Sequence, residues 1–146
     1  MELTIEQALQ QAVAAHREGK LQDAERLYRA ILQSQPLHPD ANHNLGILAA
    51  SVNKTDAALP LFKTAVEANP KIEQFWVSYI DALTKEKQFD NAKQVLFNQK
   101  TTGGSIWTEN FDTWENGGKG KKILNFLWGK LLPSTVGQTE LFTGAL

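Results

Sequence analysis

Apolar residues recur at helical spacing through the first hundred residues, in paired amphipathic stretches of about a dozen residues each. A short polar segment joins the two stretches of each pair, at residues 17–23 (REGKLQD), 51–56 (SVNKTD) and 85–90 (KEKQFD). The pairs repeat with a period of about 34 residues, which separates Pro36 from Pro70 and also separates the alanines Ala24, Ala58 and Ala92. The pattern predicts three helix–turn–helix units, over residues 5–38, 39–72 and 73–104.

The second unit carries the repeating positions most completely, at Leu45, Gly46, Ala58, Phe62, Ala65 and Pro70. This pattern resembles the tetratricopeptide repeat, a helix–turn–helix unit of the same length. The first unit keeps Gly19, Leu21, Ala24, Tyr28 and Pro36, with Gln11 and Ala12 in place of the usual Leu-Gly pair, and the third keeps Trp76, Tyr79, Phe89 and Ala92 but lacks a closing proline. The resemblance covers about two thirds of the chain and is closest to repeat proteins of bacteria. It implies an all-α fold, a right-handed α-solenoid with a C-terminal helical capping segment.

Several local signals agree with this interpretation. Thr4, followed three residues later by Gln7, predicts a capping box at the start of the first helix. Thr55 is expected to cap the second helix of the second unit. Pro60 lies a few residues into that same helix, where we expect it to cost one backbone hydrogen bond or a slight kink. Gly46 and Ala58 lie where two helices must cross closely, and only small side chains allow that approach.

The resemblance also implies a binding groove, lined by the first helix of each unit. The groove positions that it implies are Leu9, Val13, His16, Arg17, His43, Asn44, Ile47, Ser51, Val77, Asp81 and Lys85, with Glu6, Asp40 and Gln74 beside them. Four of them (Leu9, Val13, Ile47 and Val77) make an apolar row. The alternative for any single one of these positions is an ordinary solvated helix face.

One subclass of the family holds a partner's terminal carboxylate with a cluster of Lys, Asn and Arg side chains. Asn44 matches one member of that cluster. The other positions hold Leu9, Val13, Gln74 and Ser78, and none of these is cationic. The sequence therefore argues against a receptor for chaperone tails.

Residues 101–146 differ in composition from the repeats, with eight of the ten glycines and three of the four tryptophans. The apolar spacing predicts one or two short amphipathic helices there, including residues 121–132 (KKILNFLWGKLL). The favoured interpretation is a helical cap on the third unit, because terminal repeats need one. The alternatives are a helix that binds a membrane surface or a partner, and a segment that is not native to the repeats.

Composition excludes several function classes. The net charge is −1, with 15 basic and 16 acidic residues, which argues against nucleic acid as a partner. The chain has no cysteine and three histidines, and neither a G-x-S-x-G nor an H-E-x-x-H motif is present. GGKGKK (117–122) lacks the spacing of a phosphate-binding loop. We expect no enzyme activity, no cofactor and no metal, and the absence of a signal peptide favours the cytoplasm.

The sequence thus predicts a non-catalytic module that binds a protein or peptide in its concave groove. The alternative is the substrate-presenting front of a larger bacterial transferase (a glycosyltransferase, sulfotransferase or methyltransferase), since similar repeat stacks precede such domains. We expect a monomer, or a weak homodimer through the tail, and membrane contact by residues 121–132 is the less favoured interpretation.

Overall fold

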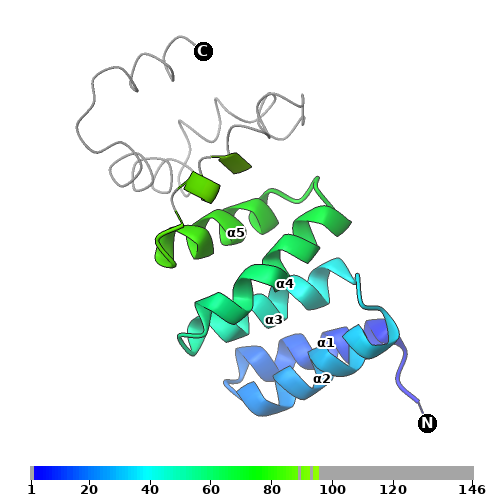
Figure 1. The fold of residues 1–146 in the computed structure, drawn as a ribbon. Helices are drawn as coiled ribbons and strands as arrows, with labels where there is room; N and C mark the ends of the chain where they lie inside the picture. The colour runs from blue at the N-terminus through cyan, green and yellow to red at the C-terminus, as the bar shows by residue number, and fades with distance from the viewer. Residues whose placement is uncertain (1, 89, 93, 96–146) are drawn as a thin grey trace, which may run out of the picture. The chain divides into compact units, whose positions relative to one another are not determined.

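Five α-helices make up the first compact unit of the chain, Met1–Glu86, in the computed structural model. The structure describes residues 2–88, 90–92, 94 and 95. The helices are α1 (Ile5–Arg17), α2 (Leu21–Ser34), α3 (Pro39–Ser51), α4 (Thr55–Ala68) and α5 (Glu73–Lys85) (Figure 1). The second unit is Lys87–Leu146, and its described residues include helical ones at 90–92, 94 and 95.

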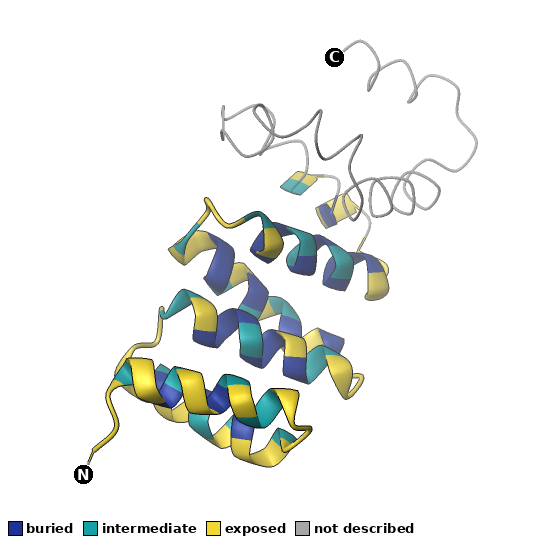
Figure 2. Cartoon of the chain, turned by 180° about the vertical axis from the view of Figure 1, so that it is seen from behind, coloured by how far each residue is buried: buried dark blue, intermediate teal, exposed yellow. Residues whose placement is uncertain are grey.

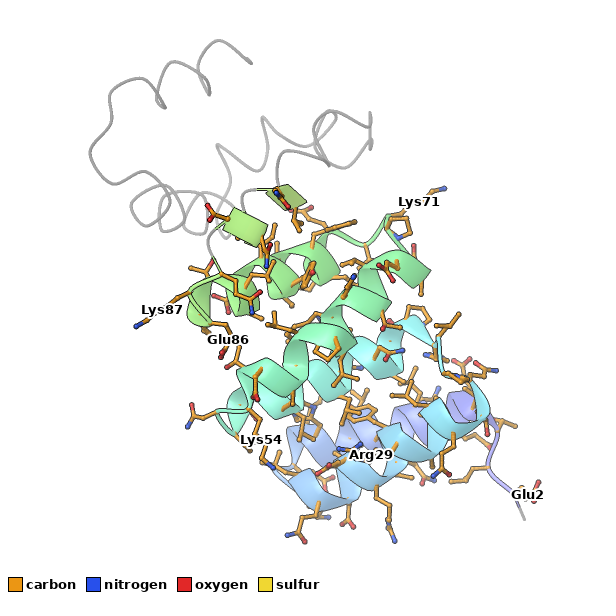
Figure 3. All side chains as sticks on the ribbon, viewed as in Figure 1. Glu2, Arg29, Lys54, Lys71, Glu86 and Lys87 are labelled. Carbon is orange, nitrogen blue, oxygen red and sulfur yellow. The ribbon has the colours of Figure 1, made fainter. Side chains whose placement is uncertain are left out.

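The helix starts keep the spacing of the sequence pattern. The first helices of the units begin at Ile5, Pro39 and Glu73, each one repeat period after the last, and α2 and α4 begin one period apart at Leu21 and Thr55. The two helices of a unit are joined on one edge of the stack, where Lys54 and Glu86 lie, and Lys71 in the turn between units lies on the opposite edge (Figure 3). This arrangement of stacked hairpins confirms the predicted all-α solenoid.

The turn within each unit uses the same left-handed backbone step. Gly19, Asn53 and Lys87 occupy the same repeat position in successive units and have φ angles of 76°, 61° and 58°. Glycine reaches this region without strain and asparagine does so readily, whereas for lysine it costs about 1–2 kcal/mol. The geometry of the turn therefore requires a positive φ at this position in every unit, and the residue type determines how much free energy that conformation costs.

Small alanines and a few large side chains make the interior, which lies between the helix layers (Figure 2). One cluster joins α1, α2 and α3 through Ala12, Ala24, Tyr28, Leu45 and Leu48. A second cluster joins α4 to α5 through Ala58, Phe62 and Ala82. Tyr28 and Phe62 occupy equivalent positions and are almost completely buried, so each fills the space between successive helices.

Gly46 lies where α3 and α4 approach each other closely. A Cβ atom at this position would lie 2.6 Å from Cε1 and 2.8 Å from Cδ1 of Phe62, well inside the normal contact distance. The Phe62 ring therefore rests directly on the backbone of α3, as the sequence predicted for a position that tolerates only a small residue.

Of the two predicted helix caps, one is confirmed and one is wrong. The capping box at Thr4 and Gln7 is confirmed, with both reciprocal hydrogen bonds present at 3.0 and 3.1 Å. The prediction for Thr55 is wrong: Lys54 occupies the N-cap of α4 without a side-chain hydrogen bond, and Thr55 is the first helical residue. The left-handed step at Asn53 sets where α4 begins, so the threonine falls one position too late to cap.

Side-chain donors fix the turns between units. The Asn42 amide donates to the carbonyl oxygens of Pro36 (3.0 Å) and His38 (2.9 Å). The indole N–H of Trp76, at the same repeat position in the next unit, donates to the carbonyl oxygen of Pro70 (2.8 Å). Both donor side chains are buried, and each fixes the backbone of the turn that contains the closing proline of the preceding unit. The turns between units are thus held by chemically different side chains at one repeat position.

Pro60 lies inside α4, and the helix continues through it to Ala68. The predicted tail helices, the cap and the dimer contact, all within residues 101–146, lie outside the described residues. Among the helices that the structure does describe, none is both long and apolar enough to cross a membrane.

Candidate functional site

A cleft of about 230 Å³ opens where α3, α4 and α5 meet. It is lined by Ile47, Ala50, Ser51, Thr55, Phe62, Ser78, Asp81, Ala82 and Lys85. Ile47, Ala50, Phe62 and Ala82 give the lining its apolar surface, whereas hydroxyl groups and an ion pair make up the rest. Mixed linings of this kind suit an extended peptide, whose side chains need apolar contacts and whose backbone needs hydrogen bonds.

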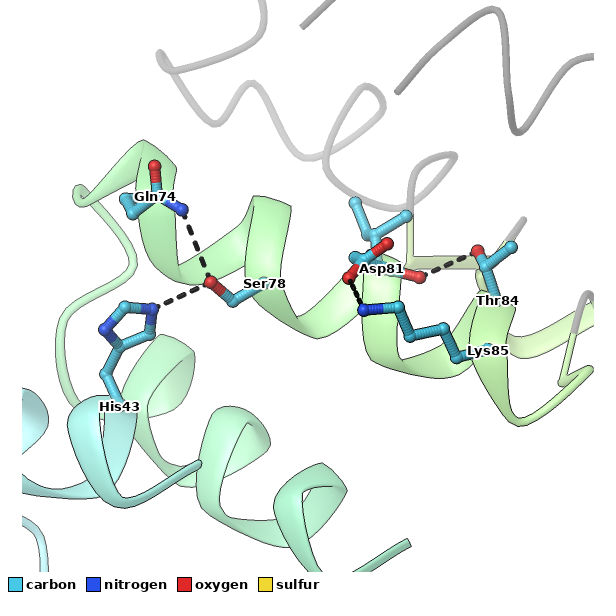
Figure 4. A network of polar contacts seen from close by, with 7 residues as sticks. His43, Gln74, Ser78, Asp81, Thr84 and Lys85 are labelled. Atoms are coloured by element: carbon cyan, nitrogen blue, oxygen red, sulfur yellow. Dashed lines mark hydrogen bonds and ion pairs between the residues drawn. The ribbon is translucent and has the colours of Figure 1, made fainter. Parts of the chain in front are cut away.

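Four of the predicted groove residues converge on this cleft: Ile47 and Ser51 from α3, and Asp81 and Lys85 from α5. Ile47 keeps 36% of its surface exposed although it is apolar. The Lys85 ammonium lies 2.9 Å from the Asp81 carboxylate, one helical turn away (Figure 4). Both partners are substantially exposed, so the pair is worth little for stability.

His43 lies in the interior beside the cleft and is only 8% exposed. Its Nε2 atom lies 2.8 Å from the Ser78 hydroxyl oxygen, and the Gln74 amide donates to the same oxygen at 3.4 Å (Figure 4). Its ring also packs against Phe75, with centroids 4.6 Å apart. His43 therefore joins α3 to α5 from the inside, and a partner cannot reach most of its surface.

Burial lowers the pKa of His43, and a hydrogen bond with Asn44 and the nearby Asp40 carboxylate offset this only in part. Desolvation disfavours the charged imidazolium, so the neutral ring is the form suited to this position. With Gln74 donating to the Ser78 oxygen, the Ser78 hydroxyl is free to donate to Nε2, which requires that nitrogen to be unprotonated.

The groove positions predicted on α1 lie elsewhere. Leu9 and Val13 are half-buried and pack against the cluster of α1, α2 and α3. The Nδ1 atom of His16 lies 3.4 Å from the Tyr28 hydroxyl, and Arg17 is exposed at the end of α1. The apolar row is thus divided: its α1 half contributes to the core, and Ile47 on α3 lines the cleft. Asn44 and Val77 are half-buried and do not line it.

Sequence reasoning missed five of the nine cleft residues: Ala50, Thr55, Phe62, Ser78 and Ala82. Ala50, Ser78 and Ala82 lie on the first helices of their units. The two alanines leave space beside them, and a prediction that considers only which residues are exposed does not detect this space. A comparison of equivalent positions in successive units could have identified the small side chains.

A second depression lies along the outer face of α2, where Arg29 is found (Figure 3). Its charges are already paired, because Arg29 lies 2.8 Å from Glu25 and Arg26 lies 3.5 Å from Asp23. It is a single polar helix face, and it offers less to a partner than the cleft does. Among the described residues, no group of three or more His, Asp or Glu side chains could hold a metal.

The stacked hairpins and the cleft between successive first helices define a helical-repeat protein of the kind that mediates protein–protein interaction. The family model described as tetratricopeptide repeat matches residues 9–71 and 43–96. The chain therefore belongs to the tetratricopeptide-repeat family. It is a protein–protein interaction module of that family.

Solved structures of similar fold include three of the protein MamA. A mutant form matches with a TM-score of 0.64 and 22% identity over 99% of this chain and 73% of that one. MamA AMB-1 matches with a TM-score of 0.60 and 22% identity over 94% of this chain and 78% of that one. MamA MSR-1 matches with a TM-score of 0.58 and 22% identity over 86% of this chain and 77% of that one. At this identity the likeness concerns the fold alone. A comparison with curated proteins finds no match.

Proposed function

We propose that the chain is a non-catalytic adaptor that binds an extended segment of a partner protein across α3 and α5, with the cleft as the main seat. The single observation that supports this is the convergence of Ile47, Ser51 and the Asp81–Lys85 pair on one opening of about 230 Å³. An exposed isoleucine at the mouth of a cleft gains from burial by a partner, at about 25 cal/mol for each Å² removed from water.

The chemistry of the cleft also favours binding over catalysis. Of its hydroxyl groups, Ser51 donates to the Leu48 carbonyl oxygen at 2.7 Å, and Ser78 is engaged by His43 and Gln74. The only histidine beside the cleft is buried behind Ser78 within the described part of the chain. The Ser51 bond lies within α3 and the Ser78 bond joins α3 to α5, and no histidine among the described residues is hydrogen-bonded to Ser51 or Thr55, so none of the three hydroxyl groups is an activated nucleophile at the opening.

The test is selection of binding peptides from a displayed random library with the full chain as bait, followed by affinity measurement on two matched variants. Ile47→Arg places a cation at the cleft mouth and is expected to weaken binding at least tenfold, about 1.4 kcal/mol. Val52→Arg is the control, because Val52 is equally apolar and 42% exposed, yet lies outside the cleft. Loss of affinity in both variants, or in neither, refutes the proposed site.

A further inference from the structure

The cleft exists because one junction between units carries smaller side chains than the other. Its lining residues Ala50, Thr55 and Ala82 are replaced, at the equivalent positions one repeat earlier, by the larger His16, Leu21 and Leu48. At that first junction Leu48 is buried, Leu21 packs against the same apolar cluster, and His16 meets the Tyr28 hydroxyl at 3.4 Å. Protein interiors normally leave little empty space, so an opening at one of two equivalent junctions is an unusual feature of the folded chain.

Thr55 is the chemically unusual member of the lining. Only 9% of it is exposed, at a repeat position where the sequence has Leu21 and Phe89 in the other units. Thr64 and Thr84 donate their hydroxyls to the carbonyl oxygens four residues earlier, at 2.9 and 2.8 Å. Thr55 is the first residue of α4, so it has no carbonyl of its own helix to bond in this way, and among residues 2–88 its hydroxyl has no other hydrogen-bond partner. A ligand that displaced water from the cleft without supplying a hydrogen bond would leave this hydroxyl unpaired, at a cost in affinity.

The charges at the rim favour an uncharged occupant. Asp81 and Lys85 pair with each other at 2.9 Å, so the cleft presents little net charge. Its floor of Phe62, Ala50 and Ala82 is apolar. A cationic or anionic side chain would lose its hydration there and meet no unpaired countercharge.

We propose that the cleft is a specificity pocket for one tyrosine side chain of the partner segment, with the ring on the apolar floor and the phenol hydroxyl hydrogen-bonded to Thr55. This rests on the proposed function, in that a partner segment presents the side chain, and it adds the identity of that side chain. Tyrosine combines a flat apolar body with one hydrogen-bonding end, which phenylalanine and leucine lack.

The experiment titrates the isotope-labelled full chain with the N-acetyl amides of tyrosine, phenylalanine and leucine, followed by two-dimensional NMR. We expect shifts at the cleft amides and millimolar affinity, as is usual for so small a ligand. The tyrosine probe should bind about fivefold more tightly than the phenylalanine probe, the effect of one net hydrogen bond. Thr55→Val, which keeps the shape, should remove this advantage and leave the affinity for the phenylalanine probe unchanged.

Two further variants control for packing. Ala50→His, which copies the side chain at the equivalent position of the first junction, should weaken binding of both aromatic probes. Ala30→His, on the exposed face of α2, should affect neither. Circular dichroism establishes that each variant folds, and the half-exposed position of Ala50 makes a larger side chain tolerable there.

Equal affinity for the tyrosine and phenylalanine probes, a preference that survives Thr55→Val, or the absence of shifts at the cleft would each overturn the proposal. The outcome is separable from that of the proposed function. Selected peptides that need Ile47 but carry no tyrosine leave groove binding intact and overturn the tyrosine pocket. Probe binding at the cleft without any selected peptide supports the pocket and refutes the adaptor function.

Discussion

Replacement of Gly46 by alanine is the most direct test of the close packing between α3 and α4. The new methyl group would meet three atoms of one ring, Cε1 at 2.6 Å, Cδ1 at 2.8 Å and Cζ at 3.1 Å of Phe62. Carbon atoms attract best at about 3.5–4.0 Å, so the ring or the helix must move by about 1 Å. Phe62 is 1% exposed, packs with Ala58 and Ala82, and has the His43 ring at 5.6 Å, so a shift of the ring disturbs these contacts even where it moves toward the cleft.

Two opposing terms set the size of the effect. Overpacking a filled interior costs about 1–3 kcal/mol. Alanine is better than glycine in a helix by about 1 kcal/mol. The net expectation is a loss of stability of about 1 kcal/mol, although the same substitution stabilises an ordinary helix.

The assay is denaturant unfolding followed by circular dichroism, in a double-mutant cycle with Phe62→Leu. The smaller side chain leaves space for the added methyl group, so Gly46→Ala should become neutral or stabilising in that background. We expect a coupling free energy of about 1–2 kcal/mol between the two positions. If Gly46→Ala stabilises the wild-type chain, or has the same effect in both backgrounds, the steric reasoning is wrong.

Three other predictions follow from local features. Because burial lowers the pKa of His43, the unfolded chain binds a proton at this residue more tightly than the folded chain does. The stability that His43 contributes is therefore complete above about pH 6.5 and is lost as the pH falls through the folded pKa. Unfolding midpoints measured from about pH 7.5 to about pH 5 should show this loss in the wild type and not in His43→Gln. Lys87→Gly should raise the unfolding free energy by about 1 kcal/mol because φ is 58° there, whereas Glu86→Gly, at φ −79°, should lower it; the opposite order in a thermal melt would contradict the strain. Asn42→Ala should cost about 1 kcal/mol in the same assay because the Pro36 carbonyl oxygen loses the amide donor and the His38 carbonyl oxygen keeps only the backbone N–H of residue 42, and an unchanged midpoint would show that the side-chain bonds are not needed.

The sequence by itself determined the features that depend on residues close together in the chain. The regular spacing of prolines and alanines predicts where helices begin and end, because Pro36 and Pro70 cannot continue the helices that precede them and small residues are needed where helices cross. The capping box at Thr4 follows from two residues three positions apart. The same logic failed at Thr55, where the turn conformation at Asn53 moved the helix start by one residue.

Only part of the predicted groove coincides with the cleft, because exposure depends on residues distant in sequence. Leu9 and Ile47 have the same apolar character, yet α2 and α3 cover much of Leu9, and Ile47 lies at an open cleft. His43 has the polarity of a groove residue and is instead held inside by Ser78, 35 positions away. No pattern along one helix contains this information.

The tertiary structure alone decided which junction is filled and which is open. The two junctions share their backbone plan, and the difference lies in side-chain volume summed over three helices: His16, Leu21 and Leu48 at the first, and Ala50, Thr55 and Ala82 at the second. Periodicity reports which residues face inward, because it depends only on the helical angle per residue. Whether the inward-facing residues together fill the available space depends on how far apart packing places the helices, and that distance is a property of the folded chain.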